Sequence, residues 1–467
     1  MTSRRRFLAQ AVAAPFARAA RRAPNILLIT ADDMNWDTPG CFGGRVPGIT
    51  PHIDRLAVQG MRFERAHVTV AVCQPSRSAM MTGRYPHRNG AEGFQPIRTD
   101  VPTLQEQLHG AGYLNGIMAK NGHLAPRAKF CWDFFITPEQ LGRGRSPELY
   151  YRFSREYFSQ AKAAGRPFFL MANSQDPHRP FAGSADELRD FGEHMPCTRR
   201  IEPREAVVPG FLPDIPGVRQ EVSEYLTSSY RCDQTVGQVL RALAESGLED
   251  DTLVMFLSDN GMSFPFSKTN CYFNSTRTPW IVRWPGRVKP GTVNRREFVA
   301  GIDFMPTILE AAGLPQVDGM DGRSFLPLLA GRPQAGRERV FTVFHETSAK
   351  QRFEMRAVEE GRFGYIFNAW SGGGREFRNE SQSGLSFPAM RAAARTDARI
   401  AERVRFFLYR TPEELYDFAA DPHGLRNLAG DPRYRPQTDR LRRTLRDNMA
   451  RTGDFLLEEF RGKVPGS

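Results

Sequence analysis

The sequence alternates short apolar runs with longer segments of helical periodicity. Mostly apolar runs predict strands that are buried on both faces, as in a parallel sheet, at residues 25–30, 113–119, 167–173 and 252–257. Segments with apolar residues at helical spacing lie between these runs, at residues 103–112, 148–164 and 218–245. This alternation predicts a doubly wound α/β domain.

The pattern changes near residues 331–336, which are rich in glycine and proline. Shorter strands are predicted beyond it, at residues 340–345, 353–358 and 363–367, and a charged amphipathic helix is predicted from Pro432 onward. We therefore expect two domains after the N-terminal segment. They are a catalytic domain over residues 20–335 and a smaller C-terminal α+β domain, with an antiparallel sheet and a terminal helix, over residues 336–467.

Carboxylate and amide side chains that could bind a metal directly follow two of the predicted buried strands. Asp32 and Asp33 come directly after the first strand, and Asp259 and Asn260 come after the last of the four. Ligands of open α/β sheets bind beyond the carboxyl ends of the strands, and adjacent carboxylates repel unless a positive charge lies between them. Oxygen ligands without histidine favour Ca²⁺, or Mg²⁺, over zinc. The alternative is a loop or helix-capping role for one of the aspartates.

Cys73 lies just before Pro75, at the predicted start of a helix that includes residues 78–82. The free N–H groups and the dipole of a helix N-terminus favour an anion, and Arg77 adds a fixed positive charge. Two interpretations follow from chemistry alone. Cys73 is either a buried, inert cysteine or a thiolate nucleophile with a lowered pKa.

A third interpretation comes from resemblance. Cys73-x-Pro75-Ser76-Arg77, followed by Thr82-Gly83-Arg84, resembles the signature of the type I sulfatases, in which the cysteine is converted after translation to formylglycine. Residues 264–270 are similar to the N-sulfoglucosamine sulfohydrolase branch of that family, and the resemblance extends from Asn25 to about Ala429. It implies an alkaline-phosphatase-like fold and a separate maturation enzyme that generates the formylglycine.

The resemblance also implies roles for single residues. Lys120 and His123 would bind the sulfate and the aldehyde-derived hydroxyls, although the family spacing Lys-x-His is Lys-x-x-His here. His178 would protonate the leaving group, and Lys268 would contact the sulfate oxygens. Taken one at a time, such residues are more often surface lysines or structural histidines. The implied catalytic residues are Cys73, Arg77, Lys120, His123, His178 and Lys268, and the implied metal ligands are Asp32, Asp33, Cys73, Asp259 and Asn260.

The implied activity is hydrolysis of a sulfate ester or an N-sulfate of a glycosaminoglycan-like sugar. His345, Glu346 and Arg356 are candidate sugar contacts, with surface or core roles equally open. Two other functions remain possible. One is hydrolysis of phosphate or phosphonate monoesters within the same superfamily, and the other is non-catalytic glycan binding.

The N-terminus and the composition bear on location. Ser3-Arg4-Arg5-Arg6-Phe7 resembles a twin-arginine export signal, so we expect a signal peptide over residues 1–19, the Tat machinery as a partner and a periplasmic or secreted protein. A basic N-terminal arm is the alternative. The formal net charge of +12 suits an anionic substrate, but no basic stripe with interleaved aromatics indicates nucleic-acid binding. No apolar run predicts a membrane span in the mature protein, and six cysteines permit disulfides without requiring them.

Overall fold

The computed structural model describes residues 23–464. The expected signal peptide at residues 1–19 lies outside these residues. None of the helices within residues 23–464 combines the length and the apolar composition that crossing a bilayer requires.

The larger part of the chain is built on a sheet of eight strands in the order β5-β4-β6-β1-β7-β8-β2-β9. The strands from β5 to β7 are parallel, β8 is antiparallel to both of its neighbours, and β9 is parallel to β2. The strands are β1 (Asn25–Ala31), β2 (Met61–Phe63), β4 (Leu114–Met118), β5 (Phe134–Ile136), β6 (Phe168–Asn173), β7 (Thr252–Ser258), β8 (Trp280–Arg283) and β9 (Thr292–Asn294). β3 (Ala66–His67) and β10 (Val299–Ala300) form a separate parallel pair.

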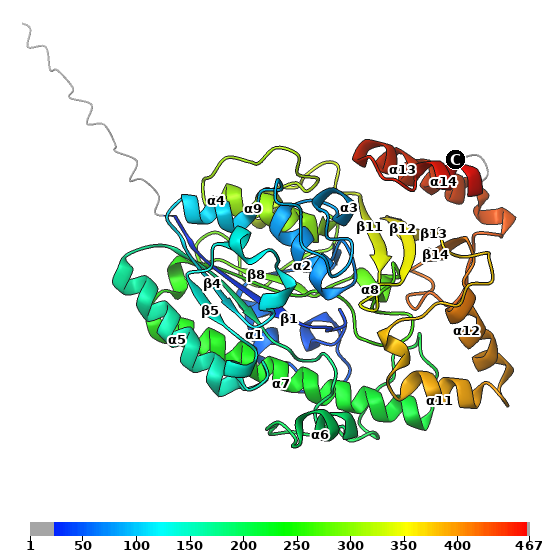
Figure 1. Cartoon of the computed structure of the whole chain (residues 1–467), viewed down its shortest axis with the longest axis horizontal. Helices are drawn as coiled ribbons and strands as arrows, with labels where there is room; N and C mark the ends of the chain where they lie inside the picture. Colours follow the sequence, from blue (N-terminus) through cyan, green and yellow to red (C-terminus); the bar gives the residue numbers. More distant parts are fainter. Residues whose placement is uncertain (1–22, 465–467) are drawn as a thin grey trace, which may run out of the picture.

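Helices cover both faces of this sheet because successive side chains of a strand point to opposite sides. On β1, Ile26 and Leu28 pack with α2 (Cys73–Thr82), α4 (Leu104–Gly110) and α9 (Phe304–Ala311). Leu27 and Ile29 pack with α1 (Pro51–Gln59), α5 (Pro147–Ala164) and α7 (Pro216–Ser246) on the other face (Figure 1). The predicted doubly wound α/β domain is confirmed, and the antiparallel strand β8 makes its sheet mixed.

The C-terminal region forms a second, antiparallel sheet in the order β11-β12-β13-β14. Its strands are β11 (Arg339–Glu346), β12 (Arg352–Glu360), β13 (Phe363–Asn368) and β14 (Glu413–Asp417). The charged helix α13 (Arg435–Thr452) buries Leu441, Leu445 and Met449 against this sheet. The predicted terminal helix therefore packs on the sheet instead of extending into solvent (Figure 1). The remaining helices are α3 (Pro86–Asn89), α6 (Ala185–Phe191), α8 (Phe273–Thr276), α10 (Leu326–Leu329), α11 (Ser386–Ala393), α12 (Ala398–Tyr409) and α14 (Leu457–Lys463).

A buried histidine and a glutamate meet between the β3-β10 pair and the antiparallel sheet. Nε2 of His67, on β3, lies 3.6 Å from Oε2 of Glu359, on β12. Burial raises the pKa of Glu359 from its ordinary value of 4.5 to about 7, and burial lowers the pKa of His67 to about 3. Both groups are therefore neutral near pH 5, and Glu359 becomes a buried carboxylate as the pH rises through 7.

We expect Glu359→Gln to become more stable relative to the wild type as the pH rises from 4.5 to 7. In that window the folded wild type retains a proton that the unfolded chain has released, so the wild type loses stability with rising pH. The glutamine has no proton to lose. Because Glu359 keeps 14% of its side chain exposed, the relative gain at pH 8 should be about 1–3 kcal/mol. Thermal melts at pH 5 and pH 8 measure it, and an equal offset in Tm at both values would contradict this account.

Candidate functional site

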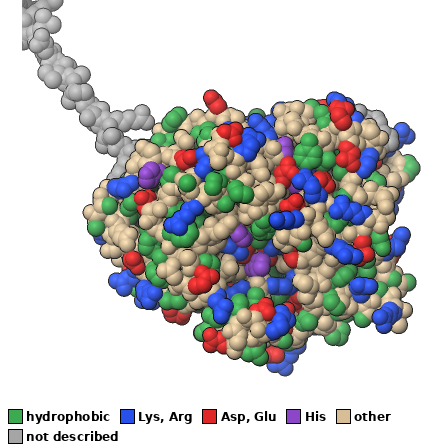
Figure 2. All heavy atoms as spheres, viewed as in Figure 1, with side chains coloured by type: hydrophobic (Ala, Val, Ile, Leu, Met, Phe, Trp, Pro, Cys, Tyr) green, Lys and Arg blue, Asp and Glu red, His purple; other side chains and the backbone are tan. Residues whose placement is uncertain are grey.

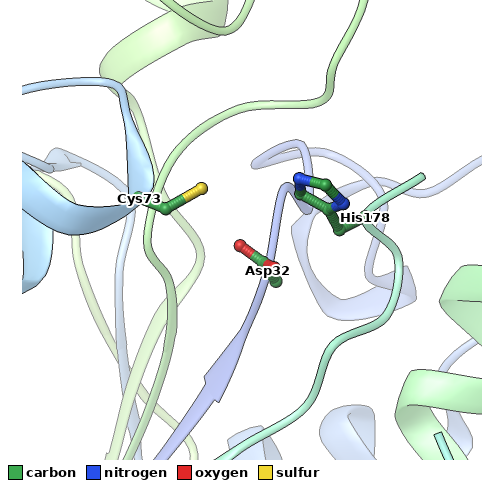
Figure 3. A group of neighbouring side chains, drawn as sticks. All are labelled: Asp32, Cys73 and His178. Atoms are coloured by element: carbon green, nitrogen blue, oxygen red, sulfur yellow. The ribbon is translucent and has the colours of Figure 1, made fainter. Parts of the chain in front are cut away.

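The carboxyl ends of β1 and β7 and the N-terminus of α2 converge on one pocket. The two strands pair in register to Ala31 and Ser258, so the aspartates that follow them lie together. Figure 3 shows Asp32 at the end of β1 with its carboxylate directed towards Cys73 and the His178 ring. One ligand atom from each of four residues lies within 4.8 Å of the others, and these residues are Asp32, Asp33, Cys73 and Asp259.

Local backbone conformation explains why these side chains meet. Asp33 has a φ of 70°, a left-handed conformation that departs from strand geometry. Neighbouring carboxylates that would point to opposite faces of a strand can therefore share one pocket. α2 begins at Cys73 because Val72 is still extended, with a φ of −153°. Pro75 is tolerated in the first turn because backbone N–H groups there have no acceptor within the helix. The cysteine is thus at the predicted helix N-terminus.

Each carboxylate of the pocket has a basic partner. Arg77, which is 1% exposed, donates to Oδ2 of Asp259 from Nε at 3.0 Å and from Nη2 at 2.7 Å. Lys120 pairs with Asp32, and Nζ of Lys268 lies 2.7 Å from Oδ1 of Asp33. Further hydrogen bonds from Arg77 Nη1 reach Asn173 Oδ1 at 2.6 Å and Thr30 Oγ1 at 3.0 Å. Arg77 therefore ties α2 to the ends of the central strands.

The pKa values of the acidic groups reflect this crowding. Burial raises the pKa of Asp259 to about 7, against the effect of Arg77, and the charges of Asp32 and Asp33 raise it further. Burial also opposes ionisation of Asp32, yet Lys120 and other nearby bases hold its pKa well below the usual range. A further positive charge in the pocket would relieve the repulsion among the three carboxylates.

The thiol of Cys73 is not activated in this environment. Burial, followed by the charge of Asp32, raises its pKa well above 9.0. A nucleophilic cysteine requires the opposite shift, so the structure disfavours the thiolate interpretation. All six cysteines are free thiols in the described part of the chain, so none of the disulfides that the count permits is formed.

The residues present fit a hard divalent cation. Nδ2 of Asn260 donates to Oδ1 of Asp33 at 2.7 Å and to the carbonyl of Gly261 at 2.9 Å, which fixes the orientation of the amide. Its Oδ1 atom is buried and has no hydrogen-bond partner within residues 23–464. A bare amide oxygen beside clustered carboxylates is the donor set that Ca²⁺ or Mg²⁺ takes in proteins.

His178 follows β6 and is held with one ring nitrogen facing the pocket. Its Nδ1 lies 2.5 Å from the carbonyl of Arg179, and because a carbonyl only accepts, Nδ1 carries the proton. Nε2 is then the atom that faces the carboxylates, 3.9 Å from Oδ2 of Asp33. The side chain is 36% exposed, and histidine side chains reach the surface near the middle of the face drawn in Figure 2. His178 can therefore exchange a proton between the pocket and an entering molecule.

The unusual Lys-x-x-His spacing is accommodated by a tight turn. Ala119 and Lys120 have φ values of 55° and 53°, and the 3₁₀ turn Asn121–His123 follows at once. Burial, followed by the charges of Lys120 and Arg77, lowers the pKa of His123 well below 6.5. Its ring is therefore neutral at physiological pH, and Nδ1 has no hydrogen-bond partner in the described chain. The bare ring nitrogen can accept a hydrogen bond, but the lowered pKa makes His123 a weak base.

The structure does not bring two of the expected sugar contacts to the site. His345 is completely buried at the end of β11, and Arg356 is 1% exposed, where it pairs with Asp454 and donates to the carbonyl of Phe344 at 3.2 Å. The prediction of sugar contact is therefore wrong for His345 and Arg356, which have the core role that was the alternative. Glu346 is partly buried and packs closely on the backbone of Gly93. A Cβ atom placed on Gly93 would lie 2.3 Å from Oε1 of Glu346.

One residue of the pocket was not predicted from the sequence. Oε1 of Glu380, in the 3₁₀ turn Glu380–Gln382, lies 3.4 Å from Nζ of Lys268. Glu380 lies between β13 and β14, so it comes from the C-terminal region. No motif or periodicity surrounds it, and only the folded arrangement identifies it.

Two family models and a curated relative match this chain over much of its length. Residues 24–314 match the model of the sulfatase family, and residues 262–369 match a model described as the C-terminal part of N-sulphoglucosamine sulphohydrolase. Human N-sulphoglucosamine sulphohydrolase is 31% identical over 465 residues, covering 92% of this chain and 90% of that protein.

Solved structures share the fold. The structure of BT4656 in complex with its substrate D-glucosamine-2-N,6-O-disulfate has a TM-score of 0.69 and 18% identity, and covers 96% of this chain and 100% of that chain. The phosphonate monoester hydrolase of Agrobacterium radiobacter has a TM-score of 0.67 and 19% identity, and covers 92% of this chain and 96% of that chain. At these identities the similarity describes the fold and does not choose between sulfate and phosphonate substrates.

Proposed function

The chain belongs to the sulfatase family, and from that premise we propose that it hydrolyses the N-sulfate or a sulfate ester of a glycosaminoglycan-like sugar, with N-sulfoglucosamine as the first candidate. The observation that carries the proposal is the convergence of Asp32, Asp33 and Asp259 on position 73, with a basic residue beside each carboxylate. A sulfate monoanion is a poor electrophile unless its charge is neutralised, and Lys120, Lys268 and a bound cation would together supply that charge. The 31% identity to human N-sulphoglucosamine sulphohydrolase over 92% of this chain supports the choice of sugar.

We propose that Cys73 is converted to formylglycine by a dedicated maturation enzyme. The unmodified thiol is a poor nucleophile here, because burial raises its pKa. Formylglycine, once hydrated, supplies one hydroxyl to attack sulfur and a second hydroxyl whose deprotonation expels sulfate and restores the aldehyde. A signal peptide at residues 1–19 would place the mature enzyme in the periplasm or outside the cell, after conversion in the cytoplasm.

The remaining residues of the pocket have separate tasks in this proposal. Lys120 and Lys268 stabilise the negative charge on the transferring group. His178 would deliver a proton from Nε2 to the leaving oxygen or nitrogen while Nδ1 stays engaged with the backbone, which requires the doubly protonated ring. Burial lowers the pKa of His178, and the charge of Asp33 beside Nε2 opposes that effect. His123 is the proposed acceptor of the proton released when sulfate departs. Because its pKa is lowered, that role requires the negative charge of the departing sulfate to favour the protonated ring. Arg77, fixed by Asp259, orders the first turn of α2.

We propose that the cation is Ca²⁺, with Mg²⁺ as the alternative, held by Asp32, Asp33, Asp259, Asn260 and residue 73. When bound, it supplies fixed positive charge beside the reacting group.

Calcium is expected to raise the Tm of the wild type, since a ligand that binds only the folded state stabilises it. Asp259→Asn removes a ligand charge but keeps an acceptor for Arg77, so it should weaken Ca²⁺ affinity by about 100-fold or more. Isothermal titration with Ca²⁺ gives the affinity independently of turnover. Asp251→Asn, an exposed aspartate just before β7, is the matched control. Equal Ca²⁺ affinity in both variants would contradict the assignment of the ligands.

Sulfate release from N-sulfoglucosamine tests the function itself. The comparison substrates are 4-nitrophenyl sulfate and 4-nitrophenyl phosphate, used with protein whose residue 73 is verified as formylglycine. We expect kcat/KM for the sulfated sugar to exceed that for the phosphate monoester by at least about 100-fold. Faster phosphate turnover would favour the phosphate or phosphonate hydrolase, and sugar binding without turnover would favour the non-catalytic relative.

A further inference from the structure

A segment of the C-terminal region, residues 379–386, lies against the predicted catalytic residues. We call it the rim segment. At its first residue, Nδ2 of Asn379 donates to the carbonyl of Lys268 at 3.3 Å and to Oγ1 of Thr269. Thr269 has a φ of 63°, so the loop that presents Lys268 is held in a conformation that few side chains adopt. The rim segment thus supports the backbone of a residue that would contact sulfate.

The other end of the rim segment is fixed by Glu221 of α7. Its Oε2 accepts a hydrogen bond from the N–H of Ser386 at 2.7 Å, and its Oε1 accepts one from Nε of Arg179 at 3.1 Å. A Cβ atom at Gly384 would lie 1.8 Å from Oε1 of Glu221, so the backbone packs directly on this ion pair. Arg179 is the neighbour of His178. The rim segment is therefore anchored at both ends to loops of the pocket.

Glu380 is the charged residue that this anchored segment presents. Its side chain is 24% exposed, and its Oε1 lies 3.4 Å from Nζ of Lys268. Its Oε2 is buried and has no hydrogen-bond partner within residues 23–464. Lys268 does not need Glu380 for neutralisation, because Asp33 lies closer, at 2.7 Å. A buried carboxylate oxygen without a donor is unfavourable, and a bound molecule with an N–H or O–H group can satisfy it.

We propose that Glu380 determines specificity by accepting a hydrogen bond from the sugar. The donor is either the sulfamate N–H or a hydroxyl group next to the scissile sulfate. This inference rests on the proposed function. A carboxylate at this position favours an N-sulfated amino sugar, because cleavage converts the sulfamate nitrogen into an amine that takes up a proton and pairs with an anion. It disfavours a second anionic substituent next to the scissile group. The C-terminal domain thereby contributes to substrate selection as well as to stability.

The test compares Glu380→Ala and Glu380→Gln with the wild type on two substrates. N-sulfoglucosamine offers a donor beside the scissile sulfate, and 4-nitrophenyl sulfate offers none. We expect Glu380→Ala to lower kcat/KM for the sugar by about 30-fold to 100-fold, and at least about tenfold more than for the aryl sulfate. The glutamine variant keeps an acceptor without the charge. Its kcat/KM for the sugar should lie between that of the wild type and that of Glu380→Ala. Aryl-sulfate turnover and the Tm show that each variant is folded.

Two failures are distinguishable. If the wild type, with formylglycine verified, does not hydrolyse N-sulfoglucosamine, the proposed function fails and this inference fails with it. If the wild type hydrolyses the sugar but Glu380→Ala loses both activities by the same factor, the proposed function survives. In that case Glu380 acts only through Lys268, and its role in selecting the sugar is overturned.

Discussion

Replacing Cys73 with alanine is expected to abolish sulfate release, lowering kcat by about 10⁴-fold or more. The alanine cannot be converted to formylglycine, so the pocket loses both of the hydroxyls on which turnover depends in the proposed mechanism. The fold should be retained, since Cys73 is the first residue of α2 and the side chain of Arg77 carries the hydrogen bonds that hold the helix in place. The Tm is expected to stay close to that of the wild type, which separates loss of chemistry from loss of structure.

Cys73→Ser gives a sharper form of the same prediction. A serine hydroxyl can attack sulfur once, but it has no second hydroxyl with which to expel the sulfate. We expect at most about one equivalent of leaving group per enzyme, followed by arrest with sulfate bound to Ser at position 73. Many turnovers by the serine variant at a rate near that of the wild type would rule out the aldehyde cycle.

His178→Gln is expected to lower kcat by about 10²-fold to 10⁴-fold for a sugar sulfate and by much less for 4-nitrophenyl sulfate. The alkoxide or amine of a sugar is a poor leaving group and needs a proton, whereas 4-nitrophenolate leaves without one. Since Nδ1 of His178 binds the Arg179 carbonyl, the glutamine amide can keep that contact while losing the transferable proton. Steady-state kinetics on the two substrates measure the difference.

His109→Gln is the matched control for this variant, because His109 lies on α4 with 49% of its side chain exposed. It should leave both activities unchanged. Equal losses of the two activities in His178→Gln would show that His178 positions the substrate without acting as the proton donor.

The sequence predicted the pocket through features that are local. Asp32, Asp33, Asp259 and Asn260 directly follow apolar strands, and the carboxyl ends of neighbouring parallel strands meet at one edge of a sheet. A single argument about strand ends therefore brings together residues more than two hundred positions apart. The helix N-terminus at Cys73 was equally local, because it depends on the backbone around Pro75. Resemblance to a family then supplied the roles that chemistry alone left open.

The contribution of the C-terminal region could not be predicted in this way. The expectation of sugar contact at His345 and Arg356 rested on the possibility that C-terminal segments reach the sugar, with surface or core roles equally open. The partner that buries Arg356 is Asp454, almost a hundred residues later, and no short-range pattern links the two. Glu380 shows the converse. It lies in an irregular loop, and only the contacts of Asn379 and Glu221 place it beside Lys268. Long-range pairing decides these cases, and it appears only in the folded chain.

The most direct test is tandem mass spectrometry of the peptide that contains residue 73, from active protein purified from its native host. The account predicts the mass of formylglycine, or of its hydrate, at that position in protein that releases sulfate. An unmodified cysteine at residue 73, in protein that releases sulfate as fast as formylglycine-containing protein, would contradict the proposed mechanism.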